Sequence, residues 1–174
     1  GTYPPGSTFK MVTAIAGLEE GIITPSTKIL DKGAYTYYPG TPPKCWIYRQ
    51  HGTTHGLVNV SEAIKVSCNY FFFDVGRRLG IDRLVDYATR FGLGEKTGIE
   101  LTERSGVMAS REYTESLGQK WYDGNTLSVA IGQENSAFTP IQLADYIATL
   151  VNGGTRYSTH LLKEVKSSDF TNVE

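Results

Sequence analysis

The feature that most constrains the fold is a lysine on what the surrounding pattern predicts to be the inner face of a helix. Residues Ser7 to Glu20 read as a helix, with a serine suited to the first turn and Gly21 to end it. Because positions i, i+3, i+4 and i+7 share one helix face, Ser7 and Lys10 fall on an apolar stripe. The apolar members of this stripe are Met11, Ala14, Ile15 and Leu18. A helix with this pattern must either bury the Lys10 amine or let the lysine side chain extend along the surface to solvent.

Burial of Lys10 would have a chemical consequence. Desolvation disfavours the charged amine and lowers its pKa, and the positive end of the helix dipole acts in the same direction. A lysine that is neutral part of the time, within reach of the Ser7 hydroxyl, is a general base beside a nucleophile. The same spacing also arises from composition alone, with Ser7 as a helix cap and Lys10 in solvent. Both interpretations stay open on this motif.

Composition narrows the classes of protein that the chain can represent. With 174 residues, of which 40% are hydrophobic and 20% charged, it is long enough for one domain with a core. The formal net charge is −1, so there is no basic field to hold nucleic acid, and no nucleic-acid partner is expected. No apolar run approaches the roughly 20 residues that cross a bilayer. A membrane anchor of the parent protein would therefore lie outside this chain.

The remaining pattern predicts a largely helical domain with a few strands. Residues 24–56 are rich in Pro, Gly and Tyr and should form strands and long loops, and residues 93–125 read as loop. Besides the first helix, four further helices are expected. The first of these is capped by Ser61 and ends near Cys68 and Asn69, and the second is the segment YFFFDVGRRLG. The third starts after Asp82, and the fourth runs from Thr139 to Asn152.

A second serine lies where two of these helices meet, in the triplet Ser67-Cys68-Asn69. A hydroxyl and a carboxamide two residues apart at such a junction can both point into a cleft. Ser67 could relay a proton there, and Asn69 could hydrogen-bond a substrate amide. The triplet alone is weak, because serine and asparagine are common at helix ends as caps. Together with Ser7 and Lys10 it is a stronger signal.

Four segments in order resemble one family. PPGSTFK, SCN, FGLGEKTGIEL and IGQENSAFTPIQLADYIATLVNGGTRY are similar to the transpeptidase domain of class B penicillin-binding proteins, of the elongation type. The resemblance implies an α+β fold of the penicillin-binding-protein and serine β-lactamase type. Residues 1–174 would be one partial domain, mostly helical, with an incomplete central sheet. Ser7 would be the nucleophile, Lys10 its base, and Ser67 and Asn69 the second motif.

The resemblance also implies a function. Ser7 would attack the penultimate D-Ala carbonyl of a peptidoglycan stem peptide, and an amine of a neighbouring stem would resolve the acyl-enzyme. β-Lactam antibiotics would acylate the same serine, and the chemistry would need no cofactor. The parent protein would stand on the extracytoplasmic face of the bacterial cytoplasmic membrane, tethered by an anchor absent from this chain, and work with the cell-wall elongation machinery.

Two alternatives share the first two motifs. One is a serine β-lactamase, although the chain has no Glu-x-x-Leu-Asn element to position a deacylating water. The other is a non-catalytic β-lactam sensor or scaffold of the same fold.

The third motif of the family raises a separate question. Lys96-Thr97-Gly98 has the same three residue types as this motif. It nevertheless matches the family's FGLG…TGI segment instead, and it lies in a predicted loop that follows a helix. In the family the motif lies on a core strand that comes after the TPIQLADYIATLVNGG element. We therefore expect the true motif, with the terminal sheet strands, beyond Glu174. That strand would supply one of two oxyanion N–H groups, so this fragment alone should acylate poorly.

Two cysteines and two histidines lie close together in the sequence, just before and within the second motif. Cys45, His51, His55 and Cys68 are the donor set of a closed tetrahedral zinc site, which here would be structural. Such a site would fasten the irregular loop of residues 35–56 to the back of the second motif. A Cys45–Cys68 disulfide, or no link between these residues, are the alternatives.

Overall fold

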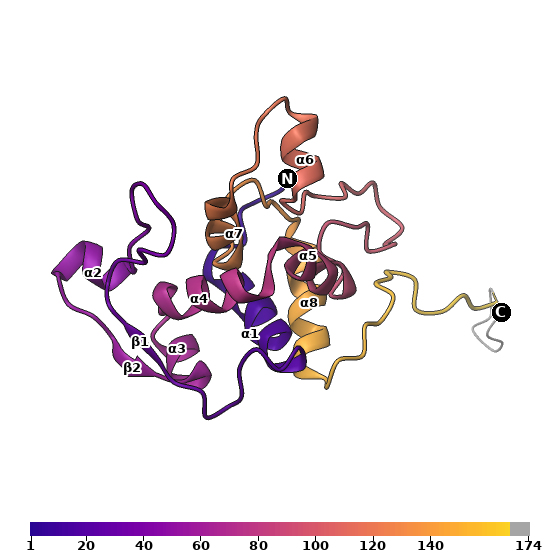
Figure 1. The fold of residues 1–174 in the computed structure, drawn as a ribbon. Helices are drawn as coiled ribbons and strands as arrows, with labels where there is room; N and C mark the ends of the chain where they lie inside the picture. Colours follow the sequence, from indigo (N-terminus) through magenta and orange to yellow (C-terminus); the bar gives the residue numbers. More distant parts are fainter. Residues whose placement is uncertain (168–174) are drawn as a thin grey trace.

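Helices are the main regular elements of the computed structural model, which describes residues 1–167 (Figure 1). No helix within these residues is both long and apolar enough to cross a bilayer. The elements in chain order are the 3₁₀ helix η1 (Gly6–Phe9), α1 (Lys10–Glu19), β1 (Ile29–Asp31), α2 (Trp46–His51), β2 (Gly56–Val58), α3 (Val60–Lys65), α4 (Asn69–Leu79), α5 (Ile81–Arg90), α6 (Arg111–Ser116), α7 (Asp123–Ala130) and α8 (Pro140–Val151).

The first helix differs from its prediction in two respects. The chain forms a 3₁₀ turn over Gly6–Phe9 before α1 begins at Lys10. Lys10 and Ala14 of the predicted stripe are buried as expected, but Met11, Ile15 and Leu18 are only partly buried. Because α1 packs against α3, α4 and α5, it is covered on more than one side, and its most buried positions lie beside that stripe. These positions are Val12, Thr13, Ala16 and Gly17.

Two other helix starts are displaced by one or two residues. Asn59 caps α3, where Ser61 was expected to do so. The Asn59 side chain accepts the Glu62 N–H at 3.0 Å, and the Glu62 carboxylate accepts the Asn59 N–H at 2.8 Å. α5 begins at Ile81 directly after Gly80, one residue before Asp82. The helix Pro140–Val151 agrees with its prediction and has Thr139 as its cap.

Three short helices were not expected from the sequence. α2 lies in the segment read as strands and loops, whereas α6 and the start of α7 lie in the polar segment 93–125. α2 has no buried residue and therefore no periodic apolar face to reveal it. Within residues 1–167 the expected strands are limited to one antiparallel pair, β1 and β2, in which Leu30 lies opposite Leu57.

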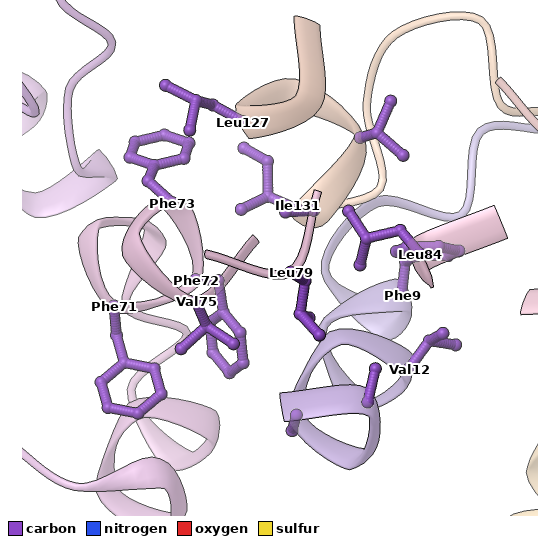
Figure 2. Packing of buried hydrophobic residues seen from close by; sticks show 14 of the residues in the cluster. Phe9, Val12, Phe71, Phe72, Phe73, Val75, Leu79, Leu84, Leu127 and Ile131 are labelled. Atoms are coloured by element: carbon purple, nitrogen blue, oxygen red, sulfur yellow. The ribbon is translucent and has the colours of Figure 1, made fainter. Parts of the chain in front are cut away.

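The core lies where α1, α4, α5 and α7 meet, and Figure 2 shows its side chains. Three consecutive aromatic residues of α4, Phe71, Phe72 and Phe73, are at most 2% exposed. Fully burying one such side chain contributes about 2–3 kcal/mol. This packing matters for the site because α1 begins at Lys10 and α4 begins at Asn69. The core therefore fixes the ends of the two helices that carry the candidate catalytic residues.

Candidate active site

The amine of Lys10 lies at the centre of the site. The residue is 2% exposed, and its Nζ donates to Asn69 Oδ1 at 2.6 Å and to Ser67 Oγ at 2.7 Å. It also contacts the Ser67 carbonyl at 3.0 Å and Ser7 Oγ at 3.2 Å. The Ser67 hydroxyl in turn donates to Ser7 Oγ at 3.0 Å. The structure thus brings together the four residues that the sequence singled out as catalytic candidates.

The surroundings of Lys10 lower the pKa of its amine and so increase the neutral fraction. Burial lowers the pKa of Lys10 from 10.5 to about 8, although the nearby Cys45 and Cys68 thiols oppose this decrease. None of its hydrogen-bond partners is a carboxylate, so no paired charge offsets the loss of water. With a pKa of about 8, roughly a tenth of the amine is neutral at pH 7.

Ser67 has an unusual backbone conformation. Its φ is +52°, in the left-handed region, which costs a non-glycine residue roughly 1–2 kcal/mol. This turn joins α3 to α4 and lets the Ser67 hydroxyl and carbonyl oxygens both contact the same amine. Cys68 is consequently the N-cap residue of α4, whereas the sequence had placed it near the end of the preceding helix. Strain of this kind is concentrated at functional sites.

A contact between two glycines holds the turn that carries Ser7. The Gly6 N–H donates to the Gly132 carbonyl at 2.9 Å, and both glycines have positive φ, +54° and +73°. A Cβ on Gly132 would lie only 2.0 Å from the Gly6 carbonyl oxygen. The loop after α7 therefore approaches the backbone of Gly6, directly before Ser7, as closely as a glycine allows.

A cavity of about 460 Å³ opens over these residues, and Ser7, Ser67 and Asn69 line it. α2 forms part of its wall through Trp46 and Arg49. Trp46 fixes this helix in place, because its Nε1 donates to the Val66 carbonyl at 3.1 Å. Nothing in the sequence predicted this wall. The helix carries no pattern that would have indicated it.

The Lys96-Thr97-Gly98 sequence lies in a loop, as expected. The Thr97 hydroxyl and N–H both donate to Glu103, at 2.6 and 3.1 Å. Lys96 is exposed and lines a different cavity from the one that contains Ser7. Among residues 1–167, no residue of a Lys-Thr-Gly motif lines the Ser7 cavity.

A buried cluster of potential metal ligands lies behind the second motif. Asp31, Cys45, His55 and Cys68 each offer one ligand atom, and these atoms all lie within 4.8 Å of one another. His51, which the sequence had included, is not part of it. α2 ends at His51, and Gly52, with φ +68°, turns the chain, so His51 is exposed and only His55 reaches the cluster. Asp31 takes the fourth position.

The cluster's internal contacts connect four elements. His55 Nδ1 lies 2.9 Å from Asp31 Oδ2 and 3.4 Å from Cys45 Sγ. The sulfur atoms of Cys45 and Cys68 are 4.0 Å apart, and both are free thiols. Asp31 ends β1 and His55 precedes β2, whereas the two cysteines are the N-cap residues of α2 and α4.

Cys45 and Asp31 are the members of the cluster whose anionic forms are favoured. Contact with Cys68 lowers the pKa of Cys45 to about 6, while the same contact and burial raise the pKa of Cys68. Burial alone would raise the pKa of Asp31, but N–H groups of His55 and Gly33 hydrogen-bond to it and hold its pKa below the usual value. The cluster therefore offers thiolate, imidazole and carboxylate donors, which is a ligand set that zinc accepts.

Comparison with known proteins identifies the family. The model of the penicillin binding protein transpeptidase domain matches residues 1–174. The chain belongs to the penicillin-binding-protein transpeptidase family. Peptidoglycan D,D-transpeptidase MrdA of Escherichia coli K12 is 39% identical over 164 residues, which is 93% of this chain and 25% of that protein. The chain therefore spans about a quarter of this curated relative.

Solved structures of class B penicillin-binding proteins share the fold. Pseudomonas aeruginosa PBP2, solved in complex with WCK 5153, matches with a TM-score of 0.84 and 39% identity, over 92% of this chain and 36% of that one. Helicobacter pylori PBP2, solved in complex with MreC, matches with a TM-score of 0.84 and 28% identity, over 100% of this chain and 31% of that one. The resemblance and the mostly helical portion of the fold that the sequence predicted are confirmed.

The close contact at Gly132 yields a first prediction. Gly132→Ala should destabilise the protein by about 2–4 kcal/mol, because it adds a clash with the Gly6 backbone to the cost of a left-handed alanine. Gly21→Ala is the matched control, since Gly21 also has positive φ, +65°, but a Cβ there meets nothing within 4 Å. Urea unfolding of both variants measures the difference. Equal destabilisation of the two would contradict a clash at Gly132.

Proposed function

We propose that the protein containing this segment is a D,D-transpeptidase that cross-links peptidoglycan stem peptides through an acyl-enzyme on Ser7. The observation that carries the proposal is the buried Lys10 amine, which contacts both the Ser7 and the Ser67 hydroxyl. Ser7 itself is exposed to the cavity, as a nucleophile must be. Membership of the transpeptidase family supports the same reaction.

Hydrogen-bond geometry suggests how Lys10 acts as the base. A charged amine has three protons, but four oxygen atoms surround this one. When the amine loses a proton, the two shortest contacts, to Asn69 and Ser67, can keep the remaining N–H groups. The lone pair is then directed to the longest contact, Ser7 Oγ at 3.2 Å. Ser7 can give its proton to this lone pair as its oxygen bonds to the substrate carbonyl carbon.

Asn69 and Ser67 have separate roles in this mechanism. Because Asn69 Oδ1 accepts from Lys10, its Nδ2 remains to donate to a carbonyl of the bound peptide. The Ser67 hydroxyl bridges Lys10 and Ser7 and can relay the proton to the departing D-Ala amine. The backbone N–H of Ser7, in the first turn of η1, has no intrahelical acceptor and is one donor for the oxyanion.

We expect the first step to depend on the neutral form of Lys10. In the full-length protein, acylation of Ser7 by benzylpenicillin should rise about tenfold per pH unit below pH 8 and level off above it, because the pKa of Lys10 is about 8. Lys10→Arg, which stays charged, should slow acylation at least about a hundredfold. A fluorescent penicillin measures both, with Ser7→Ala as the blank. Lys65→Arg is the control, since Lys65 is exposed at the end of α3.

A rate that stays level from pH 6 to 9 would contradict this role for Lys10. Turnover of a D-Ala-D-Ala peptide or thioester donor with an amine acceptor separates the alternatives. A sensor would be labelled without such turnover, and a β-lactamase would hydrolyse the penicillin rapidly instead of retaining it.

The acylation mechanism needs a second oxyanion donor besides the Ser7 N–H. We infer from the family resemblance that this donor lies on the strand of the third motif, because no residue of a Lys-Thr-Gly motif lines the cavity among residues 1–167. Loss of one donor costs about a hundredfold to a thousandfold in rate. Residues 1–174 alone should therefore react with fluorescent penicillin far more slowly than the full-length protein. Stoichiometric labelling of the segment alone would contradict this assignment.

The location and partners of the parent protein follow from this reaction. Peptidoglycan stem peptides lie outside the cytoplasmic membrane, so we place the protein on its extracytoplasmic face. The relation to the PBP2 of the MreC complex supports a place in the cell-wall elongation machinery. β-Lactams would act as donor mimics that trap Ser7.

We further propose that Asp31, Cys45, His55 and Cys68 hold a structural zinc ion. Two sulfurs that share a tetrahedral zinc lie about 3.8 Å apart when each zinc–sulfur bond is about 2.3 Å. The observed separation is 4.0 Å, whereas a disulfide would need about 2.05 Å. Zinc would neutralise the buried negative charge and play no part in the acyl transfer.

The zinc proposal predicts a defined metal content. Protein prepared with zinc under reducing conditions should contain one zinc per chain, and His55→Ala should lose most of it because a buried donor is removed. His51→Ala should retain the metal, since His51 is exposed outside the cluster. Elemental analysis with a free-thiol count measures both. Zinc-free protein with two free thiols would contradict the proposal, and so would protein without free thiols, which would indicate the disulfide.

A further inference from the structure

The α2 wall of the cavity carries a cation that the mechanism does not use. Arg49 follows Trp46 by three residues, and residues at this spacing share one helix face. Trp46 is hydrogen-bonded to the carbonyl of Val66, directly before the second motif. Both Trp46 and Arg49 line the cavity that contains Ser7 and Asn69. The contact that fixes Trp46 thus also holds Arg49 on the same side as the second motif.

No other group at the cavity neutralises this charge. Among the described residues, none that lines the cavity is acidic, and no ion pair or hydrogen bond forms with the Arg49 side chain. Several other arginines do have carboxylate partners, for example Arg78 with Asp74 at 2.5 Å. Lys10 is unable to serve a ligand, because its amine already has four oxygen partners.

The position of Arg49 indicates which part of a substrate it would meet. Its helix is hydrogen-bonded to Val66, three residues before Asn69, and the proposed mechanism gives the Asn69 amide a carbonyl of the donor peptide. Arg49 would therefore meet the part of the donor that stays on Ser7. A guanidinium at such a cavity binds a carboxylate with paired, charge-assisted hydrogen bonds.

We propose that Arg49 is a specificity-determining residue that favours donors carrying a carboxylate in their acyl part. The inference rests on the proposed transpeptidase function, because it concerns the donor of that reaction.

Two penicillins that differ by one carboxylate test the inference in the full-length protein. Benzylpenicillin and its α-carboxy derivative have the same ring system, and the extra carboxylate lies in the acyl side chain. Arg49→Gln should reduce the second-order acylation rate constant of the α-carboxy compound about fivefold to tenfold and change that of benzylpenicillin less than about twofold. Arg49→Lys should retain part of the preference, since it keeps the charge but not the paired geometry.

Arg111→Gln is the matched control, because it removes the same charge from an exposed position on another six-residue helix, α6. It should leave the ratio of the two rate constants unchanged, and urea unfolding should show that all three variants are folded. An Arg49→Gln variant that slows both penicillins equally, or neither, would overturn the inference while leaving the proposed function intact. If neither penicillin acylates Ser7 in the unaltered protein, the proposed function itself fails and the inference with it.

Discussion

A primary amine can leave water only if its protons find acceptors, and Lys10 meets this demand with atoms from a distant part of the chain. Three of its four contacts come from Ser67 and Asn69, 57 and 59 residues further along. α1 therefore cannot bury its lysine until the junction of α3 and α4 is in place beside it. The left-handed turn at Ser67 is part of the same solution, because it presents two oxygens of one residue to one nitrogen.

The chemistry follows from the kind of acceptor. Hydroxyl, carbonyl and carboxamide oxygens satisfy the amine's protons without supplying a full negative charge, so burial is not balanced and the pKa falls to about 8. A carboxylate in the same position would have stabilised the charged form and kept the lysine from accepting a proton. Burial of this amine therefore makes the lysine a better base but lowers the stability of the fold. The buried aromatic side chains of α4 offset that loss of stability.

The sequence could predict Ser7, Lys10, Ser67 and Asn69, because each pair is close along the chain and the order of the motifs matches one family. It could not predict Asp31 or Arg49. Asp31 is one of many acidic residues, and only the pairing of β1 with β2 brings it to His55. His51 was included instead because its spacing to His55 suits a shared site. Gly52 ends the helix between them, and no spacing argument shows where a chain turns.

α2 connects the two features that the sequence left undetermined. Its N-cap residue, Cys45, belongs to the buried cluster, and the next residue, Trp46, is hydrogen-bonded to the carbonyl before Ser67. The helix has no fully buried residue of its own, so these two attachments, together with the partly buried Trp46 and Ile47 that pack against the core, hold it at the cavity. Cys68 lies between Ser67 and Asn69 and faces the cluster while they face Lys10. One short segment thus joins the cluster, the second motif and the wall that carries Arg49, which makes the cluster a support of the substrate cavity.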